Sequence, residues 1–295
     1  TGNFAVHGWD LAHGVEVLGD EKRYSLIVWF KPPFDVASGG TGWYDDLAAA
    51  GYREAEYRLG AHCEAKGDIE AAQKWFERAA TSGHWFSMHR LGCLHRRRGE
   101  ATGRAEAATW LRRCAQLGYA AAQVELGDHI CEESSMALGP HRSGPALPPP
   151  EAVALYNDAA AQGHPAGQHR VALTMFRSGD AAQGEALLRM AAGQGWADAQ
   201  VELGRCLQKA GKSHEEIAGW FNRAAVQGHP GAMNQLALME SHSGNHVAAR
   251  TWLEEAAMSG SIAAMNNLAL YLEQGVGGPQ DVTAAEQWRD RARGN

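Results

Sequence analysis

Three histidines at equivalent places in a recurring sequence pattern are the first groups that could do chemistry. His84, His164 and His229 each follow a glycine directly. Imidazole nitrogens bind zinc at about 2.0 to 2.1 Å, whereas neighbouring helices pack about 8 to 10 Å apart. Equivalent histidines of different repeats therefore lie too far apart to share one ion. We expect these side chains to serve helix entry and loop packing instead.

The pattern that carries these histidines repeats along most of the chain. Segments such as WFERAATSG end in glycine, and a segment such as AQVELG follows. The closing glycines lie 32 to 35 residues apart, except for one interval of 45: Gly51, Gly83, Gly118, Gly163, Gly195, Gly228 and Gly260. Because the apolar residues recur at helical spacing, each repeat is predicted to be two antiparallel helices, roughly 51–63 and 69–82 in the first. The glycine supplies the left-handed cap of the second helix, and stacking of the hairpins provides the core.

These motifs resemble Sel-one-like repeats, which are relatives of the tetratricopeptide repeat. The patterns A-x-x-x-L-G and W-[FL]-x-x-A-A-x-x-G cover about residues 43–295. The resemblance implies a mainly α fold, a right-handed superhelical α-solenoid of about seven antiparallel helix pairs. It also implies a non-enzymatic adaptor that binds one or more proteins, as a peptide or a subunit surface, or a structural subunit of a larger complex. No cofactor is expected for such a chain.

Related tetratricopeptide repeats turn the first helix of each pair toward a groove. By that analogy the partner-binding candidates are Tyr57, His89, Arg96, Val124, His169, Arg205, Asn234, Asn266 and Asn267. The asparagine amides can hydrogen-bond an extended peptide backbone, and the arginines can pair with acidic groups. The alternative is a helix surface with incidental polarity.

A proline-rich insertion interrupts the array at residues 138–150. Its prolines forbid helix and favour an extended polyproline segment: Pro145, Pro148, Pro149 and Pro150. Pro150 stands just ahead of an expected helix start at Glu151. Pro145 and Pro148 form a bare PxxP that could dock in an aromatic groove. The alternative is an exposed loop.

The N-terminal residues 1–34 differ from the repeats, and residues 35–42 are a predicted linker. A Gly-Asp turn and the run YSLIVWF at residues 24–30 predict β-strands. His13 enters one strand and Arg23 opens the next. This arrangement is similar to the C-terminal end of an Fe(II)/2-oxoglutarate dioxygenase domain of the prolyl hydroxylase type. That resemblance implies that His13 binds the metal and Arg23 the 2-oxoglutarate carboxylate, with Fe(II) and 2-oxoglutarate as cofactors, if the parent domain is complete.

The chain as given lacks the rest of such a site. A facial triad needs an H-x-D or H-x-E pair upstream of the third ligand, and nothing upstream of His13 supplies it. This chain alone is therefore not expected to be an enzyme. The alternative hypothesis is the C-terminal part of a hydroxylase whose repeats recruit substrate. If residues 1–34 do not come from such a domain, we expect them to form a β-hairpin cap on the first helix.

The composition of the chain limits the kinds of partner and environment that we expect for it. The formal net charge of −7 argues against broad nucleic-acid affinity, which depends on an excess of Lys and Arg. The five cysteines show no C-x-x-C spacing, so we expect a reduced, intracellular chain. The longest apolar run, residues 24–30, is too short to cross a bilayer, so no transmembrane segment is expected.

Overall fold

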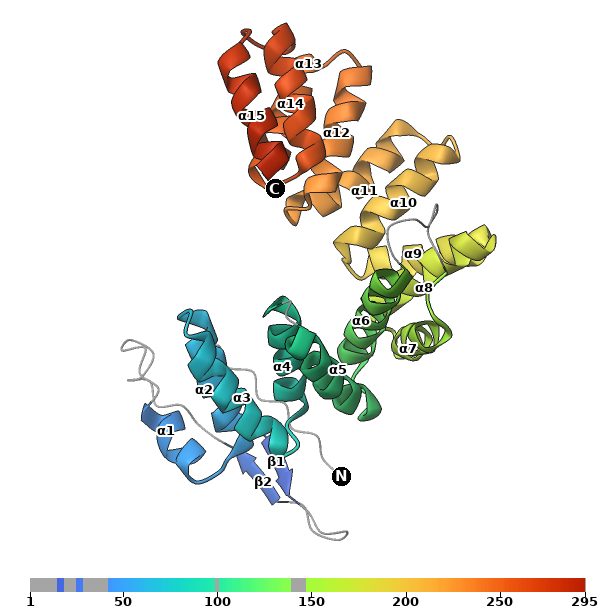
Figure 1. Cartoon of the computed structure of the whole chain (residues 1–295). Coiled ribbons are helices and arrows are strands. Elements are labelled where there is room, and N and C mark those ends of the chain that lie inside the picture. Colours follow the sequence, from blue (N-terminus) through green and yellow to red (C-terminus); the bar gives the residue numbers. More distant parts are fainter. Residues whose placement is uncertain (1–14, 19–24, 29–41, 99–100, 139–146, 295) are drawn as a thin grey trace. The chain divides into compact units, whose positions relative to one another are not determined.

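The computed structural model describes residues 15–18, 25–28, 42–98, 101–138 and 147–294 (Figure 1). The chain divides into two compact units, Thr1–Leu117 and Gly118–Asn295. The sequence predicts a single array over residues 43–295, and the structure places a boundary between two units inside it.

The described part of the first unit holds a β-hairpin and five helices. Its elements are β1 Val15–Leu18, β2 Ser25–Val28, α1 Gly42–Ala49, α2 Arg53–Ala65, α3 Ile69–Thr81, α4 Trp85–Arg98 and α5 Ala101–Gln116. The strands are antiparallel, with Val15 opposite Val28 and Leu18 opposite Ser25. They confirm the predicted short N-terminal β segment, while α2 and α3 confirm the first predicted helix pair.

The described part of the second unit is a succession of antiparallel helix pairs. Its elements are α6 Ala120–Leu138, α7 Pro150–Ala161, α8 Pro165–Ser178, α9 Ala181–Gly193, α10 Ala197–Lys209, α11 His214–Val226, α12 Pro230–His242, α13 His246–Met258, α14 Ile262–Gln274 and α15 Val282–Gly294. We call the first helix of each pair the A helix and the second the B helix. Together with α2–α5, the described residues form seven pairs, which confirms the predicted class of α-solenoid.

The glycines that close α1 and the first six B helices have the predicted left-handed backbone. Their φ angles run from 79° to 92° at Gly51, Gly83, Gly118, Gly163, Gly195, Gly228 and Gly260. A residue with a Cβ is strained in this conformation, which explains the recurrence of glycine. Within each unit, the left-handed residue reverses the chain so that the helix that follows packs back on the helix that the glycine closes.

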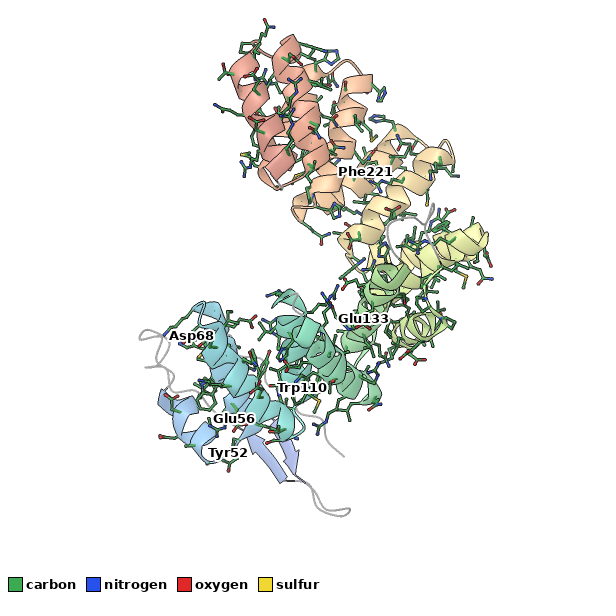
Figure 2. All side chains as sticks on the ribbon, in the orientation of Figure 1. Tyr52, Glu56, Asp68, Trp110, Glu133 and Phe221 are labelled. Atoms are coloured by element: carbon green, nitrogen blue, oxygen red, sulfur yellow. The ribbon has the colours of Figure 1, made fainter. Side chains whose placement is uncertain are left out.

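A second recurring glycine, in the Leu-Gly pattern, makes room for a B-helix side chain. A Cβ built on Gly204 would lie 2.6 Å from the ring of Phe221, which is fully buried (Figure 2). In α12 and α13 the equivalent residues are Ala237 and the smaller Leu253, both buried. A glycine on the A helix therefore accompanies the larger phenylalanine on the B helix, and an alanine accompanies the smaller leucine.

Glutamine pairs connect the two helices of three consecutive hairpins. The B-helix C-cap residue donates from Nε2 to Oε1 on the A helix in Gln162–Gln123 (2.8 Å), Gln194–Gln168 (2.9 Å) and Gln227–Gln200 (2.9 Å). The same A-helix position holds Met233 in α12, Met265 in α14 and Glu56 in α2. Sequence reasoning missed these pairs, although the paired glutamines recur at repeat spacing.

Glu56 is a buried carboxylate with a single basic partner in the part of the chain that the structure describes. Its side chain is 4% exposed, and Oε1 lies 3.0 Å from Nη2 of Arg78 on α3 (Figure 2). The same Nη2 donates to the carbonyl oxygen of Ala48 at 3.0 Å, and the guanidinium lies 4.8 Å from the centroid of the Trp75 ring. Arg78 therefore joins α1, α2 and α3.

Arginine three residues after the tryptophan recurs on four B helices. The guanidinium carbon lies 4.6 to 5.9 Å from the ring centroid in Trp75–Arg78, Trp110–Arg113, Trp220–Arg223 and Trp288–Arg291. Residues three apart are neighbours on a helix, so the W-x-x-R spacing in the sequence was the available signal.

Candidate functional site

Polar pairs join consecutive A helices in the second unit. Nη2 of Arg170 on α8 donates to Oδ2 of Asp128 on α6 at 2.8 Å. Nδ2 of Asn267 on α14 donates to Oδ1 of Asn234 on α12 at 3.0 Å, and Oη of Tyr271 on α14 bonds Oγ of Ser241 on α12 at 2.6 Å. These contacts show which A-helix residues meet their counterparts in the next repeat. We call this surface the A-helix face; its members are Val124, Asp128, His169, Arg170, Val201, Arg205, Asn234, Leu238, Asn266, Asn267 and Leu270.

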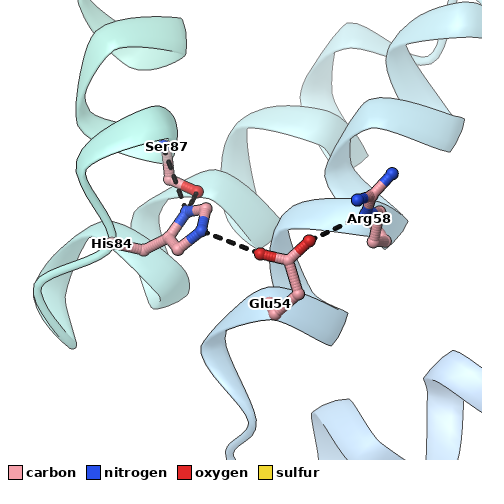
Figure 3. Close-up of polar contacts among 4 residues, drawn as sticks. All are labelled: Glu54, Arg58, His84 and Ser87. Atoms are coloured by element: carbon pink, nitrogen blue, oxygen red, sulfur yellow. Dashed lines mark hydrogen bonds and ion pairs between the residues drawn. The ribbon is translucent and has the colours of Figure 1, made fainter. Parts of the chain in front are cut away.

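The entry histidines are structural, as predicted. In the first unit, Nε2 of His84 lies 3.2 Å from Oε2 of Glu54, and its Nδ1 lies 3.0 Å from Oγ of Ser87 (Figure 3). The other oxygen of Glu54 accepts from Nε of Arg58 at 2.8 Å. Partial burial opposes ionisation of Glu54, but the hydrogen bonds with His84 and Arg58 lower its pKa.

The second unit repeats this arrangement once. Nε2 of His229 lies 3.0 Å from Oδ1 of Asp198, while Nδ1 accepts from the backbone N–H of Ala232 and so caps α12. The hydrogen bond with His229 is the main cause of the lowered pKa of Asp198. His164 stands at the same position, but Ala121 replaces the acid in the preceding repeat. In addition, the side chain of His164 does not cap α8, and its Nδ1 is buried without a hydrogen bond.

The A-helix face is charged and tightly packed around α8. Oδ1 of Asp128 accepts from Oη of Tyr156 at 2.7 Å, while Oδ2 accepts from Arg170. The neighbouring His169 is only 5% exposed. Its burial, followed by the nearby charge of Arg170, lowers the pKa of His169 to about 4.

The same face is uncharged and more open across α12 and α14. Asn234 is 8% exposed, Asn267 is half-buried and Asn266 is exposed. Leu238 and Leu270, at equivalent positions of the two repeats, are 38% and 47% exposed. Among the described residues, the side chain of Asn266 has no hydrogen-bond partner. This stretch therefore combines amide groups with accessible apolar surface.

The structure places the remaining candidates in three environments. Val124 belongs to a core cluster with 5% exposure. The ring of Tyr57 lies 4.9 Å from the ring of His84 and 5.8 Å from that of Phe86, centroid to centroid. Nη1 of Arg205 donates to Glu202 at 2.8 Å.

Two further candidates lie on α4 and are half-buried. Nε2 of His89 lies 3.6 Å from Sγ of Cys93, and Arg96 follows about one turn after Cys93 and two turns after His89, near the end of the helix. A partner-binding role for any of the nine candidates stays a prediction.

The proline-rich insertion is described only at its end, because Pro145 lies outside the described residues. Leu147 is 58% exposed, and Pro148 and Pro149 are half-buried. Pro149 has polyproline-like angles (φ −54°, ψ 146°), and α7 begins at Pro150, one residue before the predicted start. Before the insertion, α6 extends over 19 residues, compared with 13 or 14 in the other A helices. A docking role stays a prediction.

His13 and Arg23 lie outside the described residues. The paired strands β1 and β2 agree with either proposed origin of this segment, a hairpin cap or the end of a barrel. No comparison with known proteins supports a dioxygenase part, and the predicted binding of Fe(II) and 2-oxoglutarate stays untested.

The fold and the A-helix face define the class: an array of tetratricopeptide-like helix pairs. Four segments match the Sel1 repeat family, residues 53–84, 144–164, 230–261 and 262–292. The chain therefore carries four Sel1 repeats. Their fold is typical of scaffolds that bind proteins.

Solved structures agree with this assignment. One is a protective antigen of uropathogenic Escherichia coli strains with an SLR fold, at 25% identity and a TM-score of 0.59, covering 85% of this chain and 56% of that one. This chain thus spans little more than half of that protein. Another is a Sel1 repeat protein from Oxalobacter formigenes, at 24% identity and a TM-score of 0.57, covering 90% and 78%. A comparison with curated proteins found no match.

Across the described residues, no helix combines the length and the apolar character that a membrane span requires.

Proposed function

We propose that this chain is a protein-binding scaffold whose second unit holds an extended, uncharged peptide segment against the A-helix face of α12 and α14. The observation that carries the proposal is the pairing of Asn267 with Asn234 beside two accessible leucines. The Sel1 repeats support a binding role for the array as a whole.

Asparagine amides suit an extended backbone because each offers both a donor and an acceptor. In the Asn234–Asn267 pair, one amide proton and one carbonyl oxygen are used between the side chains. The remaining amide groups and those of exposed Asn266 are left for a ligand. The pair also holds its two side chains in place, which lowers the entropic cost of binding.

The apolar part of the surface sets the preference for side chains. Leu238 and Leu270 lie one repeat apart and are both partly exposed. No Asp, Glu, Lys or Arg lies between Asn234 and Leu238 or between Asn266 and Leu270. An apolar side chain of the ligand can therefore be buried between the leucines without desolvating a charge.

The test uses the full chain, immobilised and panned against a phage-displayed library of random peptides. We expect enriched peptides with apolar residues and few charges. Asn266→Ala and Asn267→Ala should each weaken the binding of a selected peptide by about two- to thirteenfold, because a hydrogen bond contributes about 0.5 to 1.5 kcal/mol. Asn222→Ala, an exposed amide on B helix α11, is the matched control and should change nothing.

Two results would overturn the proposal. One is a library that yields no peptide whose binding depends on Asn266 or Asn267. The other is enrichment of strongly charged peptides, which would locate binding elsewhere on the array.

A further inference from the structure

The buried residue His169 stands where the neighbouring repeats have valine. Val124 on α6 and Val201 on α10 occupy the same register, two residues before the apolar core residue of the A helix. Val124, His169 and Val201 are 5%, 5% and 3% exposed. The fold therefore accepts a purely apolar side chain here, and packing alone does not require an imidazole.

The surroundings of His169 leave no ready partner for a second proton. The titratable groups that face it are Arg170 on its own helix, Asp128 on α6 and Asp198 on α10. Asp128 is already bonded by Arg170 and by Tyr156 on α7, and Asp198 by His229 at the start of α12. Nε2 of His169 is buried without a hydrogen bond.

We propose that His169 makes the second unit acid-sensitive: when this buried imidazole takes up a proton, α8 loosens from the stack of A helices. A charged imidazole in this position lies beside the permanent charge of Arg170, and both nearby carboxylates are occupied. Hydration of the ring then requires local opening of α8. This inference does not depend on a bound peptide.

The direction of the change in stability with pH, and the pH range in which it occurs, follow from the coupling of proton binding to opening. The pKa of His169 in the folded chain, about 4, lies below the ordinary value of 6.5. The opened state therefore binds more protons than the closed state between these values, so stability is complete above about pH 6.5 and declines as the pH falls toward 4. Between pH 7 and pH 5 the opening constant should rise about 20-fold from this group alone.

The experiment is hydrogen exchange by mass spectrometry on the full chain at pH 7 and pH 5, corrected for the intrinsic exchange rate. Peptides that cover α8 should show the 20-fold rise in the natural chain. The rise should be several-fold smaller in His169→Val, which copies the neighbouring repeats and leaves only the contribution of His164, the N-cap residue of α8, whose pKa burial also lowers. His229→Asn keeps an N-cap acceptor and removes the other histidine of the cluster, so it should leave the rise in place.

Equal acid sensitivity in the natural chain and in His169→Val would overturn the proposal, as would its loss in His229→Asn. A second measurement uses the folded natural protein: NMR of ¹³C-labelled histidine rings, with the His169 signal assigned by His169→Gln. We expect this ring to stay neutral down to pH 5. Titration near pH 6.5 in the folded state would refute the inference without any stability measurement.

Discussion

Removal of the Arg78 guanidinium should destabilise the first unit by more than an exposed arginine normally does. Arg78→Ala leaves Glu56, with a side chain only 4% exposed, without its cation. Breaking a fully buried ion pair in this way costs about 3 to 5 kcal/mol. Because the side chain of Arg78 is 49% exposed, part of this cost is relieved by water. We therefore expect a loss of about 2 to 3 kcal/mol, including the hydrogen bond to the Ala48 carbonyl.

A double-mutant cycle isolates the buried carboxylate as the cause. Glu56→Gln introduces the residue that α6, α8 and α10 hold at this position, and it should cost no more than about 1 kcal/mol. Arg78→Ala should then be about 1 to 2 kcal/mol less damaging in the Glu56→Gln background than in the natural chain. Unfolding is followed by circular dichroism in urea, with hydrogen exchange of α2 and α3 to assign the change to the first unit.

Arg223→Ala on α11 is the matched control. Its guanidinium lies 4.6 Å from the centroid of Trp220, like that of Arg78 over Trp75, but among the described residues no carboxylate pairs with it. We expect a loss of about 0.5 to 1 kcal/mol, the usual range for an exposed cation–π contact. If Arg78→Ala costs no more than Arg223→Ala, or the same in both backgrounds at residue 56, the reasoning from the buried carboxylate is wrong.

Three further predictions concern packing and reactivity. Gly204→Ala should lower the free energy of unfolding in urea by about 1 to 3 kcal/mol, because its Cβ meets the ring of Phe221 at 2.6 Å. The double variant with Phe221→Leu copies the Ala–Leu pair of α12 and α13 and should recover most of the loss. If it recovers nothing, the clash with Phe221 is not the cause. Gln200→Met and Gln200→Ala both remove the acceptor of the Gln227 amide, but only alanine also leaves a cavity. Gln200→Met, which copies α12 and α14, should therefore change stability by less than about 1 kcal/mol, and Gln200→Ala should cost about 2 kcal/mol. Equal losses would show that the hydrogen bond matters more than the volume. Burial raises the pKa of the Cys114 thiol to about 12, so iodoacetamide at pH 8 should leave Cys114 unmodified in the folded chain and alkylate it in urea. The half-buried Cys63 is the comparison. Alkylation of Cys114 and Cys63 at equal rates in the folded chain would contradict the prediction.

Much of the helical scaffold could be predicted from the sequence because its determinants are local. Apolar residues at helical spacing mark the helices, and a left-handed residue such as Gly83 marks the end of a B helix without reference to distant residues. The predicted first pair differs from α2 and α3 by no more than two residues at each end. A role in helix entry was also predicted for the entry histidines, and in the structure His229 caps α12.

The environment of each candidate residue was decided only by tertiary packing. Val124, His169 and Asn234 share a register, so the sequence treats them alike, and all three are largely buried, whereas Asn266 at the same register is exposed. The acid that meets Nε2 of an entry histidine comes from the preceding repeat: Asp198 meets His229, whereas the repeat before His164 has Ala121 at that position.

The sequence by itself determined the repeat length, the two-helix hairpin, the capping glycines and the strands near the N-terminus. The tertiary structure decided the division into two units, the attachment of Arg78 to three helices, and which part of the A-helix face is charged and which is open. Helix period and backbone handedness are properties of neighbouring residues. Burial and ion pairing depend on side chains about thirty residues apart that meet only when hairpins stack.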